Sequence, residues 1–378
     1  MRPACLGMLL VGACSALTLA QAPGGGSPPA GWKHAAPGRP IVLPVDHGSH
    51  GDYKLEWWYY TGNLDAADGR RFGYQLTFFR IGVDPAPANP SRWAVRDLFM
   101  AHLALTDVAG RRFLFTERLN RAGPGWAGAD EGRYHVWNED WDAALDGNVH
   151  RLRAGGASQS GVQFAIDLAL TERLPPVLHG IGGYSQKGSD PGNASHYYSL
   201  PRMETRGTVT VDGRSIPVTG LSWMDHEFGT SFLEAGQLGW DWFAIQLQDG
   251  RSLMLYRFRR ADGSLDPHSS GTLVAADGRF THVPLREVRL EPGRTWSSSS
   301  SGGQYPVEWT LDLPREKLTL KTRAVLDGQE LQTRGSTGVT YWEGAIDVTG
   351  EDSGKPVSGR GYLEMTGYVG AAMSNYLR

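Results

Sequence analysis

Acidic, imidazole and aromatic side chains are concentrated in one short segment, residues 223–229, which reads WMDHEFG. On a β-strand, Trp223, Asp225 and Glu227 would share one face, because side chains alternate along a strand. An acid surrounded by aromatic rings loses solvation, which raises its pKa and lets it donate a proton near neutral pH. Such an acid could protonate an alkene, and tryptophan faces would stabilise the resulting carbocation. The alternative is a structural polar network between two barrels.

A second acid stands before four consecutive aromatic residues in the segment EWWYY, residues 56–60. Glu56, Trp58 and Tyr60 would share one strand face, and the remaining aromatics would occupy the other. A strand with aromatic residues on both faces is expected to be buried on both sides. Because a buried carboxylate needs a partner, we expect Glu56 to meet an arginine or His226.

Two further positions are candidates for a binding site. Trp240 and Trp242 would lie on one strand face, either as a stacking wall for an apolar, conjugated ligand or as barrel core. Asp241 would lie on the opposite face and is an alternative acid. His102 lies in an apolar strand, where it is either a structural hydrogen-bonding group or part of the site.

The sequence argues against several other chemistries. Asp225, His226 and Glu227 would point to alternating faces, so they could not easily share a metal ion, and no HExxH motif is present. No GxSxG motif for a serine hydrolase occurs, and the glycines at 180–183 do not open a helix. The net charge of −3 argues against nucleic acid as a partner. We therefore expect no metal, no cofactor and no nucleic acid.

The first 22 residues predict export. An arginine precedes a short apolar run and small residues, which is typical of a signal peptide. Cleavage after Ala20 would release a chain without cysteine, whereas a lipobox ending before Cys14 would leave a lipid anchor as the only membrane attachment. Residues 23–45, rich in proline and glycine, predict a linker.

From residue 46 onward the sequence predicts an all-β protein. Short aromatic and β-branched runs alternate with Asp-Gly, Asn and Pro turn signals. An aromatic strand, an Asp-Gly turn and a second strand occur around Asp68-Gly69 and recur around Asp249-Gly250. The spacing predicts two similar β-domains in tandem, at residues 46–230 and 231–378.

Four segments in order resemble one family. They read EWWYYTG at 56–62, GYSQKG leading to HYYS at 183–199, WMDHEFG at 223–229 and GWDW at 239–242. This pattern is similar to the carotenoid 1,2-hydratase-like and AttH-like family. The resemblance implies two lipocalin-like antiparallel barrels packed side by side. Hydratases of that family add water to the terminal double bond of acyclic carotenoids, and AttH-type members are exported and accompany ABC-transporter components.

Two functional hypotheses follow for an exported, periplasmic or secreted protein with a hydrophobic, isoprenoid- or polyene-like ligand. One is a hydratase or lyase that uses Asp225 or Asp241 as the acid, with His226 and Glu227 as polarising partners. The other is a non-catalytic carrier that works with an ABC transporter. In either case we expect segments 223–229, 56–60 and 196–198, the last including Tyr197, to meet around one pocket.

Overall fold

A computed structural model describes residues 31–91, 93–231 and 233–370. The predicted leader, residues 1–22, lies outside this part of the chain. The described residues form an almost entirely antiparallel β-structure in which the helices are three short 3-10 turns: η1 (Val45–His47), η2 (Leu285–Glu287) and η3 (Pro314–Glu316). No helix among these residues is long and apolar enough to cross a bilayer. The predicted all-β class is confirmed.

The first sheet has 13 strands, and its two ends approach each other to form a nearly closed barrel. In spatial order the strands are β4 (Arg112–Arg121), β3 (Asp97–Asp107), β2 (Arg71–Gly82), β1 (Leu55–Ala66), β13 (Arg214–Gly229), β12 (Ala194–Val211), β9 (Gln163–Glu172), β8 (Val149–Ala157), β7 (Trp141–Asp146), β6 (His135–Asn138) and β5 (Ala127–Ala129). Two short strands, β10 (Val177–Leu178) and β11 (Tyr184–Gln186), pair with β12.

The second sheet has 10 strands and the same kind of path. In spatial order they are β17 (Phe280–Pro284), β16 (Ser270–Val274), β15 (Ser252–Arg260), β14 (Gln237–Leu247), β25 (Lys355–Met365), β24 (Thr340–Asp352), β22 (Leu318–Ala324), β21 (Glu308–Leu313) and β18 (Arg289–Pro292), with β23 (Glu330–Gln332) beside β24. A separate ribbon joins β19 (Thr295–Ser297) to β20 (Gln304–Pro306). The chain passes from the first sheet to the second between Gly229 and Gln237.

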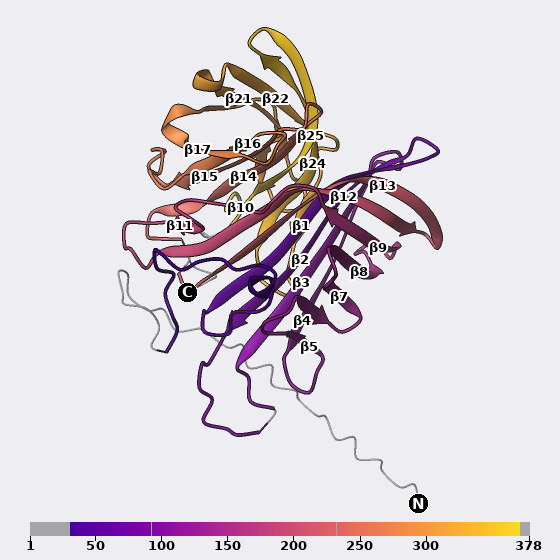
Figure 1. Cartoon of the computed structure of the whole chain (residues 1–378). Helices are drawn as coiled ribbons and strands as arrows, with labels where there is room; N and C mark the ends of the chain where they lie inside the picture. The colour runs from indigo at the N-terminus through magenta and orange to yellow at the C-terminus, as the bar shows by residue number, and fades with distance from the viewer. Residues whose placement is uncertain (1–30, 92, 232, 371–378) are drawn as a thin grey trace, which may run out of the picture.

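The two sheets are topological copies of each other. In the first, the order β4-β3-β2-β1 continues into the last strand, β13, and in the second β17-β16-β15-β14 continues into the last strand, β25. The Asp68-Gly69 and Asp249-Gly250 turns join β1 to β2 and β14 to β15, which are equivalent hairpins. The internal repeat inferred from these turns is therefore present in the fold (Figure 1).

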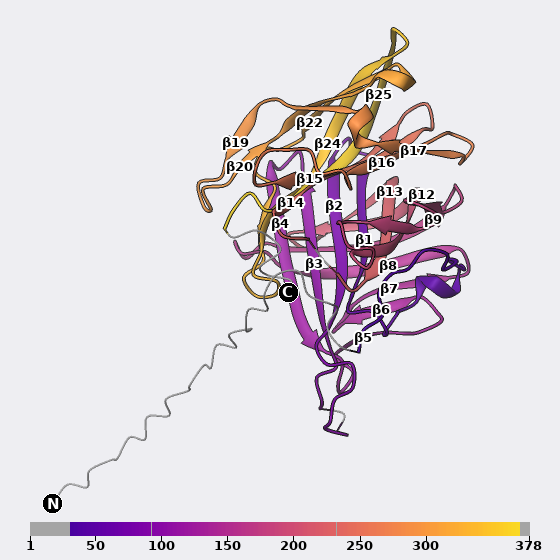
Figure 2. The same ribbon diagram turned by 90° about the vertical axis from the view of Figure 1, so that its left-hand side faces the viewer.

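Each barrel has its own apolar interior, and a third apolar cluster joins them. This third cluster contains Tyr59, Tyr197 and Trp223 from the first barrel and Trp242 and Tyr256 from the second. Polar bonds also cross the junction. They are Thr106 to Gln329 (2.6 Å), Asn63 to the Gly361 carbonyl (3.1 Å), and the ion pairs Arg71–Asp347 and Arg360–Asp65 (both 2.6 Å). The predicted pair of lipocalin-like barrels lies side by side, as Figures 1 and 2 show.

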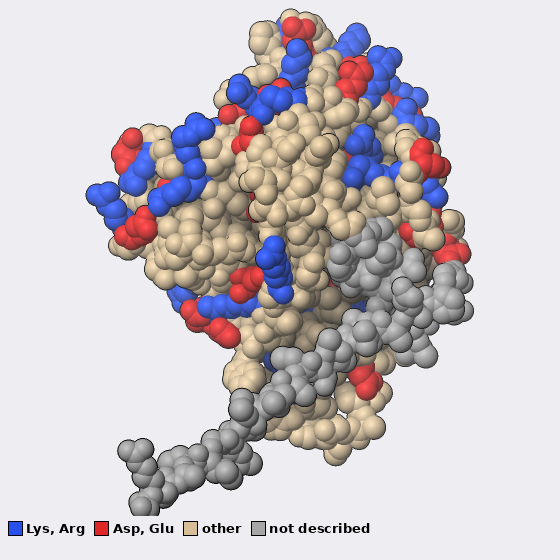
Figure 3. Space-filling view, turned by 180° about the vertical axis from the view of Figure 1, so that it is seen from behind, with Lys and Arg blue, Asp and Glu red and all other residues tan. Residues whose placement is uncertain are grey.

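The segment that precedes β1 packs against the first barrel. Trp32 is buried, and its indole lies over Gly82 so closely that an added Cβ there would come within 2.1 Å of the ring. On the face seen in Figure 3, positive and negative side chains lie next to one another. Several of the surface charges form ion pairs, for example Arg294 with Asp327 at 2.7 Å.

Candidate functional site

A cavity of about 160 Å³ lies between the two barrels. It is bounded by β1, β2, β3, β12 and β13 of the first barrel and by β14, β15, β24 and β25 of the second. Its aromatic wall comes from both barrels: Trp57, Tyr59, Tyr197, Trp240, Trp242, Tyr256, Phe258 and Tyr341. Carboxyl groups also reach it from both sides: Asp225 and Glu227 from the first barrel, Glu343 and Glu364 from the second. A cavity between domains with few polar groups in an apolar wall is typical of a small-molecule site.

Strand alternation directs Asp225 into this cavity. Trp223, Asp225 and Glu227 face the second barrel, whereas Met224 and His226 face the interior of the first. β13 lies between β1 and β12, so Asp225 stands opposite Tyr59 on one side and Ser199 on the other. The structure thus brings segments 223–229, 56–60 and 196–198 together as three neighbouring strands.

Asp225 is buried and fully engaged in hydrogen bonds. Its carboxyl group receives bonds from the Tyr197 hydroxyl (2.6 Å), the Trp223 indole N–H (2.6 Å) and the Ser199 hydroxyl. These donors favour the ionised form, but burial outweighs them and raises the pKa of Asp225 to about 7. A substantial fraction of Asp225 is therefore protonated at neutral pH, as a proton donor requires.

Glu227 carries a buried ion pair with Lys187. The Nζ atom of Lys187 lies 3.0 Å from Oε1 of Glu227, and the Ser195 hydroxyl also donates to that oxygen. The ammonium group stands over the rings of Tyr197 (4.9 Å) and Tyr256 (4.6 Å). Burial works against the charged form of Lys187, but the Glu227 carboxylate prevails and the pKa of Lys187 is raised. A fixed positive charge thus lies beside the aromatic wall.

The second barrel contributes a pair of protonated acids. Glu343 on β24 and Glu364 on β25 stand directly opposite each other, and the Tyr59 hydroxyl donates to Glu343 (3.0 Å). Burial raises the pKa of Glu364 to about 8 and that of Glu343 well above its ordinary value. Glu364 is thus a second candidate proton donor in the same cavity.

Aromatic side chains hold the site in shape. The Trp242 indole donates to the Tyr197 oxygen (3.2 Å), and its ring meets that of Tyr59 edge-on at 5.1 Å between centroids. Trp240 lines the cavity on the same face of β14. The structure therefore places both tryptophans of the GWDW segment, and Tyr197, where a conjugated ligand could stack.

His102 also lies at the cavity, with both ring nitrogens engaged. Its Nδ1 atom pairs with the Tyr341 hydroxyl and its Nε2 atom with the Ser336 hydroxyl, both at 2.8 Å. Burial lowers the pKa of His102 to about 3, so the ring is neutral. These bonds tie β3 of the first barrel to residues of the second, which gives His102 a positioning role.

Four of the other predicted residues face the interior of the first barrel. Glu56 also borders the cavity, but its carboxylate turns inward to meet His226 (3.0 Å), Arg80 (3.1 Å) and His50 (2.7 Å). Both partners expected for Glu56, an arginine and His226, are thus present. Trp58 stacks on His226 with a centroid separation of 5.0 Å, and Tyr60 lies further along the same face. His226 is therefore on the opposite face from Asp225.

Asp241 lies away from the cavity, on the inner face of the second barrel. Its carboxylate pairs with Arg257 (2.6 Å) and Arg259 (3.4 Å) and accepts a bond from Tyr368 (2.8 Å). Both arginines hold the Asp241 side chain inside the second barrel, where it cannot reach a ligand in the cavity. Of the two acids proposed from the sequence, Asp225 is the one that borders the cavity.

The sequence matches a known family over nearly its whole length. A family model described as AttH-like matches residues 34–368. The chain belongs to the AttH-like family. A Nitrosomonas europaea protein solved as an AttH is 34% identical and superposes with a TM-score of 0.79, covering 89% of this chain and 100% of that one. The family resemblance seen in the four sequence segments is confirmed.

Two enzymes are more distant relatives of this AttH-like chain. Kievitone hydratase of Fusarium solani subsp. phaseoli is 26% identical over 223 residues, 58% of this chain and 60% of the relative. A dehydratase of Emericella nidulans is 24% identical over 207 residues, 53% of this chain and 57% of the relative. The crystal structure of kievitone hydratase from Nectria haematococca, 17% identical, covers 90% of this chain and 98% of that one with a TM-score of 0.66, which shows a shared fold.

Several cavity residues of this AttH-like chain were not predicted as site residues. Lys187 belongs to the GYSQKG segment, which contributed only to the family resemblance. Glu343 and Glu364 each follow aromatic residues, in YWE and GYLE. An acid beside aromatic residues is also what singled out Glu56 and Asp225, so the same criterion applied to the last two long strands would have found both.

Proposed function

We propose that this AttH-like protein is a hydro-lyase that adds water to, or removes it from, a hydrophobic conjugated small molecule held between its barrels. The proposal rests on one observation: the Asp225 carboxyl group is buried at an aromatic cavity, and burial raises its pKa to about 7. The relatives named for hydration and dehydration support this class of reaction. An isoprenoid or polyene-like substrate suits the aromatic wall.

The geometry supports a simple hydration step. The Asp225 carboxyl group gives its proton to one alkene carbon, and a carbocation forms at the neighbouring carbon. The rings of Trp240 and Trp242, which line the cavity, stabilise that cation through their faces. Water then bonds to the cationic carbon, and the proton it releases returns to the Asp225 carboxylate. The net change is one water molecule added, and dehydration is the reverse.

Other side chains of the cavity assist this step. The Tyr197, Trp223 and Ser199 donors orient the Asp225 carboxyl group. The Lys187–Glu227 pair places a positive charge that can attract a phenolate or carbonyl oxygen of the substrate. Glu364, with its pKa raised to about 8, provides a second acid on the opposite wall.

The test is the isosteric change Asp225→Asn. Purified protein is incubated with kievitone, and separately with an acyclic carotenoid, in isotopically labelled water, and incorporation of labelled oxygen is followed by mass spectrometry. We expect Asp225→Asn to lower turnover at least ~100-fold while the affinity changes by less than about tenfold, because only the proton is lost. Asp167→Asn, on the exposed face of β9, is the matched control and should keep full activity.

A non-catalytic carrier that works with an ABC transporter is the competing proposal. A carrier needs the aromatic cavity but no acid in it. If Asp225→Asn retains wild-type function while Trp240→Ala weakens ligand binding by ~1–3 kcal/mol, the carrier replaces the enzyme. We also propose that the protein is exported, because residues 1–22 have the features of a signal peptide, with an anchor at Cys14 as the alternative.

A further inference from the structure

A cluster of two histidines and a glutamate lies inside the first barrel, on the other side of the β1–β13 layer from the cavity. His47 comes from η1, His150 from β8, and Glu172 is the last residue of β9. His150 stands opposite Leu170, so Glu172, two residues further along β9, is its diagonal neighbour on the same face. The proposed hydro-lyase reaction makes no use of these three side chains.

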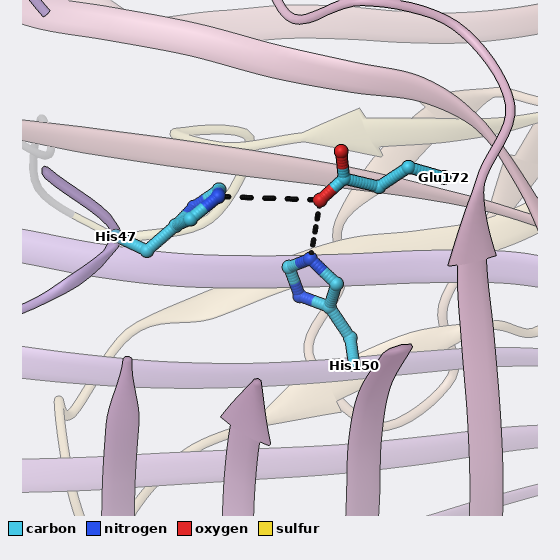
Figure 4. Close-up of side chains that lie close together, drawn as sticks. All are labelled: His47, His150 and Glu172. Carbon is cyan, nitrogen blue, oxygen red and sulfur yellow. Dashed lines mark hydrogen bonds and ion pairs between the residues drawn. The ribbon is translucent and has the colours of Figure 1, made fainter. Parts of the chain in front are cut away.

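The two imidazole rings point at the same carboxylate oxygen, as Figure 4 shows. The Nε2 atom of His150 lies 2.9 Å from Oε1 of Glu172, and the Nε2 atom of His47 lies 4.0 Å from it. All three atoms lie within 4.8 Å of one another. A tetrahedral zinc ion with bonds of about 2.0–2.1 Å would hold its ligand atoms roughly 3.3 Å apart, a value between the two observed separations.

Tyrosine hydroxyls fix the opposite nitrogen of each ring. Tyr60 donates its hydroxyl hydrogen to Tyr134 (2.7 Å), so its oxygen is left to accept from Nδ1–H of His150 (2.9 Å). The Tyr198 hydroxyl lies near Nδ1 of His47 (2.6 Å), Nδ1 of His226 (3.0 Å) and the Asp46 carbonyl (3.3 Å). Because Asp46 and His226 both offer an acceptor for its single hydrogen, its oxygen can accept from Nδ1–H of His47.

In the tautomer in which each Nδ1–H donates to its tyrosine oxygen, the lone pairs of both Nε2 atoms are directed at the carboxylate. Two acceptors as close as the Nε2 atom of His150 and Glu172 attract each other only when a proton or a metal cation lies between them. A hydrogen bond from the far nitrogen of each imidazole is also the usual support for a metal-binding histidine.

The charges around the cluster distinguish it from the other candidate groups. The structure brings together two more sets of potential ligands, His50–Glu56–His226 and Glu234–Asp266–His268. Arg80 pairs with Glu56 in the first, and Arg260 with Glu234 and Asp266 in the second, so an arginine already balances the carboxylate charge of each set. In the part of the chain that the structure describes, Glu172 is paired with no arginine or lysine.

We propose that His47, His150 and Glu172 bind a divalent transition-metal ion, with zinc as the best fit. Two imidazoles and a carboxylate suit zinc rather than magnesium or calcium, which prefer oxygen ligands. The Glu172 side chain is 27% exposed, which gives solvent a route to a fourth coordination position. No metal had been expected from the sequence, because residues 225–227 point to alternating faces and no HExxH motif is present.

The test is zinc binding by the whole exported chain after treatment with a chelator. Titration calorimetry with zinc sulfate should show one saturable site per chain. Glu172→Gln should weaken binding at least ~10-fold, because a neutral amide replaces the anionic ligand. Tyr60→Phe should also weaken it, by about 10–100-fold, because it removes only the support of His150. Glu234→Gln is the matched control and should leave affinity unchanged.

Cobalt(II) provides a second readout that does not depend on activity. Bound at this site, it should give the intense visible absorption of a four-coordinate ion, and the band should disappear in Glu172→Gln, whose partly exposed side chain can change without unfolding the barrel. Circular dichroism confirms folding of each variant. Absence of saturable zinc binding, binding unaffected by Glu172→Gln, or binding lost in Glu234→Gln would each overturn the proposal.

Discussion

The acidity of Asp225 is determined by its surroundings. Burial between the barrels raises its pKa to about 7, although three donors stabilise the carboxylate. Glu364 lies on the opposite wall, where burial raises its pKa to about 8. Asp241 shows the contrast, because it lies inside the second barrel and pairs with two arginines there. The same kind of side chain is thus a candidate acid at the cavity and an ion-pair partner in the barrel interior.

The raised pKa of Asp225 predicts how stability varies with pH. A carboxyl group whose pKa is higher in the folded state binds its proton more tightly there, so its contribution to stability is complete below its ordinary pKa of 3.8. That contribution is lost as the pH rises toward about 7. At full ionisation the loss is on the order of 4 kcal/mol. The Asp225→Asn variant has no carboxyl group at this position, so it should not lose this stability as the pH rises.

Denaturant unfolding of wild type and Asp225→Asn at several pH values tests this expectation. The stability of Asp225→Asn relative to wild type should increase between about pH 4 and pH 7 and then level off. Taking this difference cancels the titration of other groups that both proteins share. A difference that stays constant across the range would mean that Asp225 keeps an ordinary pKa.

Which acids meet at the cavity could be predicted only in part. Strand alternation correctly separated Asp225 and Glu227 from His226, because it depends only on local geometry. The sequence could not show which face of each strand lines the cavity and which lines a barrel interior. Aromatic residues occur on both faces, so they do not distinguish the two. That is why His226 and Asp241 were grouped with Asp225, although the fold turns them away from it.

At the scale of elements, the loop before β12 completes the cavity. It places Lys187 against the cavity-facing side of β12 and β13, where the ammonium group meets Glu227 and two tyrosine rings. The sequence of this loop contributed to the family resemblance, but it could not show that Lys187 would be buried. That depends on how β11 pairs with β12, with Ser185 opposite Ser195.

The buried Lys187–Glu227 pair predicts strong coupling between the loop and β13. Lys187→Met should destabilise the protein by about 3–5 kcal/mol, because it leaves a buried carboxylate without its cation. Glu227→Gln alone should also destabilise, whereas the double variant should recover a large part of the loss. Chemical denaturation of the four proteins measures this cycle. Strictly additive losses would show that the loop does not depend on the pair.

At the scale of the whole molecule, the cavity arises from a duplicated fold. In each sheet an aromatic residue of the first strand stands opposite an acid of the last strand: Tyr59 opposite Asp225, and Trp242 opposite Glu364. When the two barrels pack through these strands, both acids reach one enclosed space. The repeat of Asp-Gly hairpins made the duplication visible in the sequence, but the way in which the copies face each other is a property of the assembled fold.

The cavity therefore depends on how closely the barrels approach, and one contact tests this directly. Gly73 on β2 lies against Ala345 on β24, and a Cβ added at Gly73 would come within 2.6 Å of the Ala345 Cβ. Gly73→Ala should push the barrels apart and cost about 1–3 kcal/mol, as overpacking usually does.

Adding Ala345→Gly to Gly73→Ala exchanges the methyl group across the junction and should restore much of the lost stability. Denaturant midpoints of the two single variants and the double variant measure the effect. Ligand affinity should follow the same order, because a wider junction weakens contacts with both walls at once. If the two substitutions simply add, the methyl groups do not meet and the junction is looser than the structure indicates.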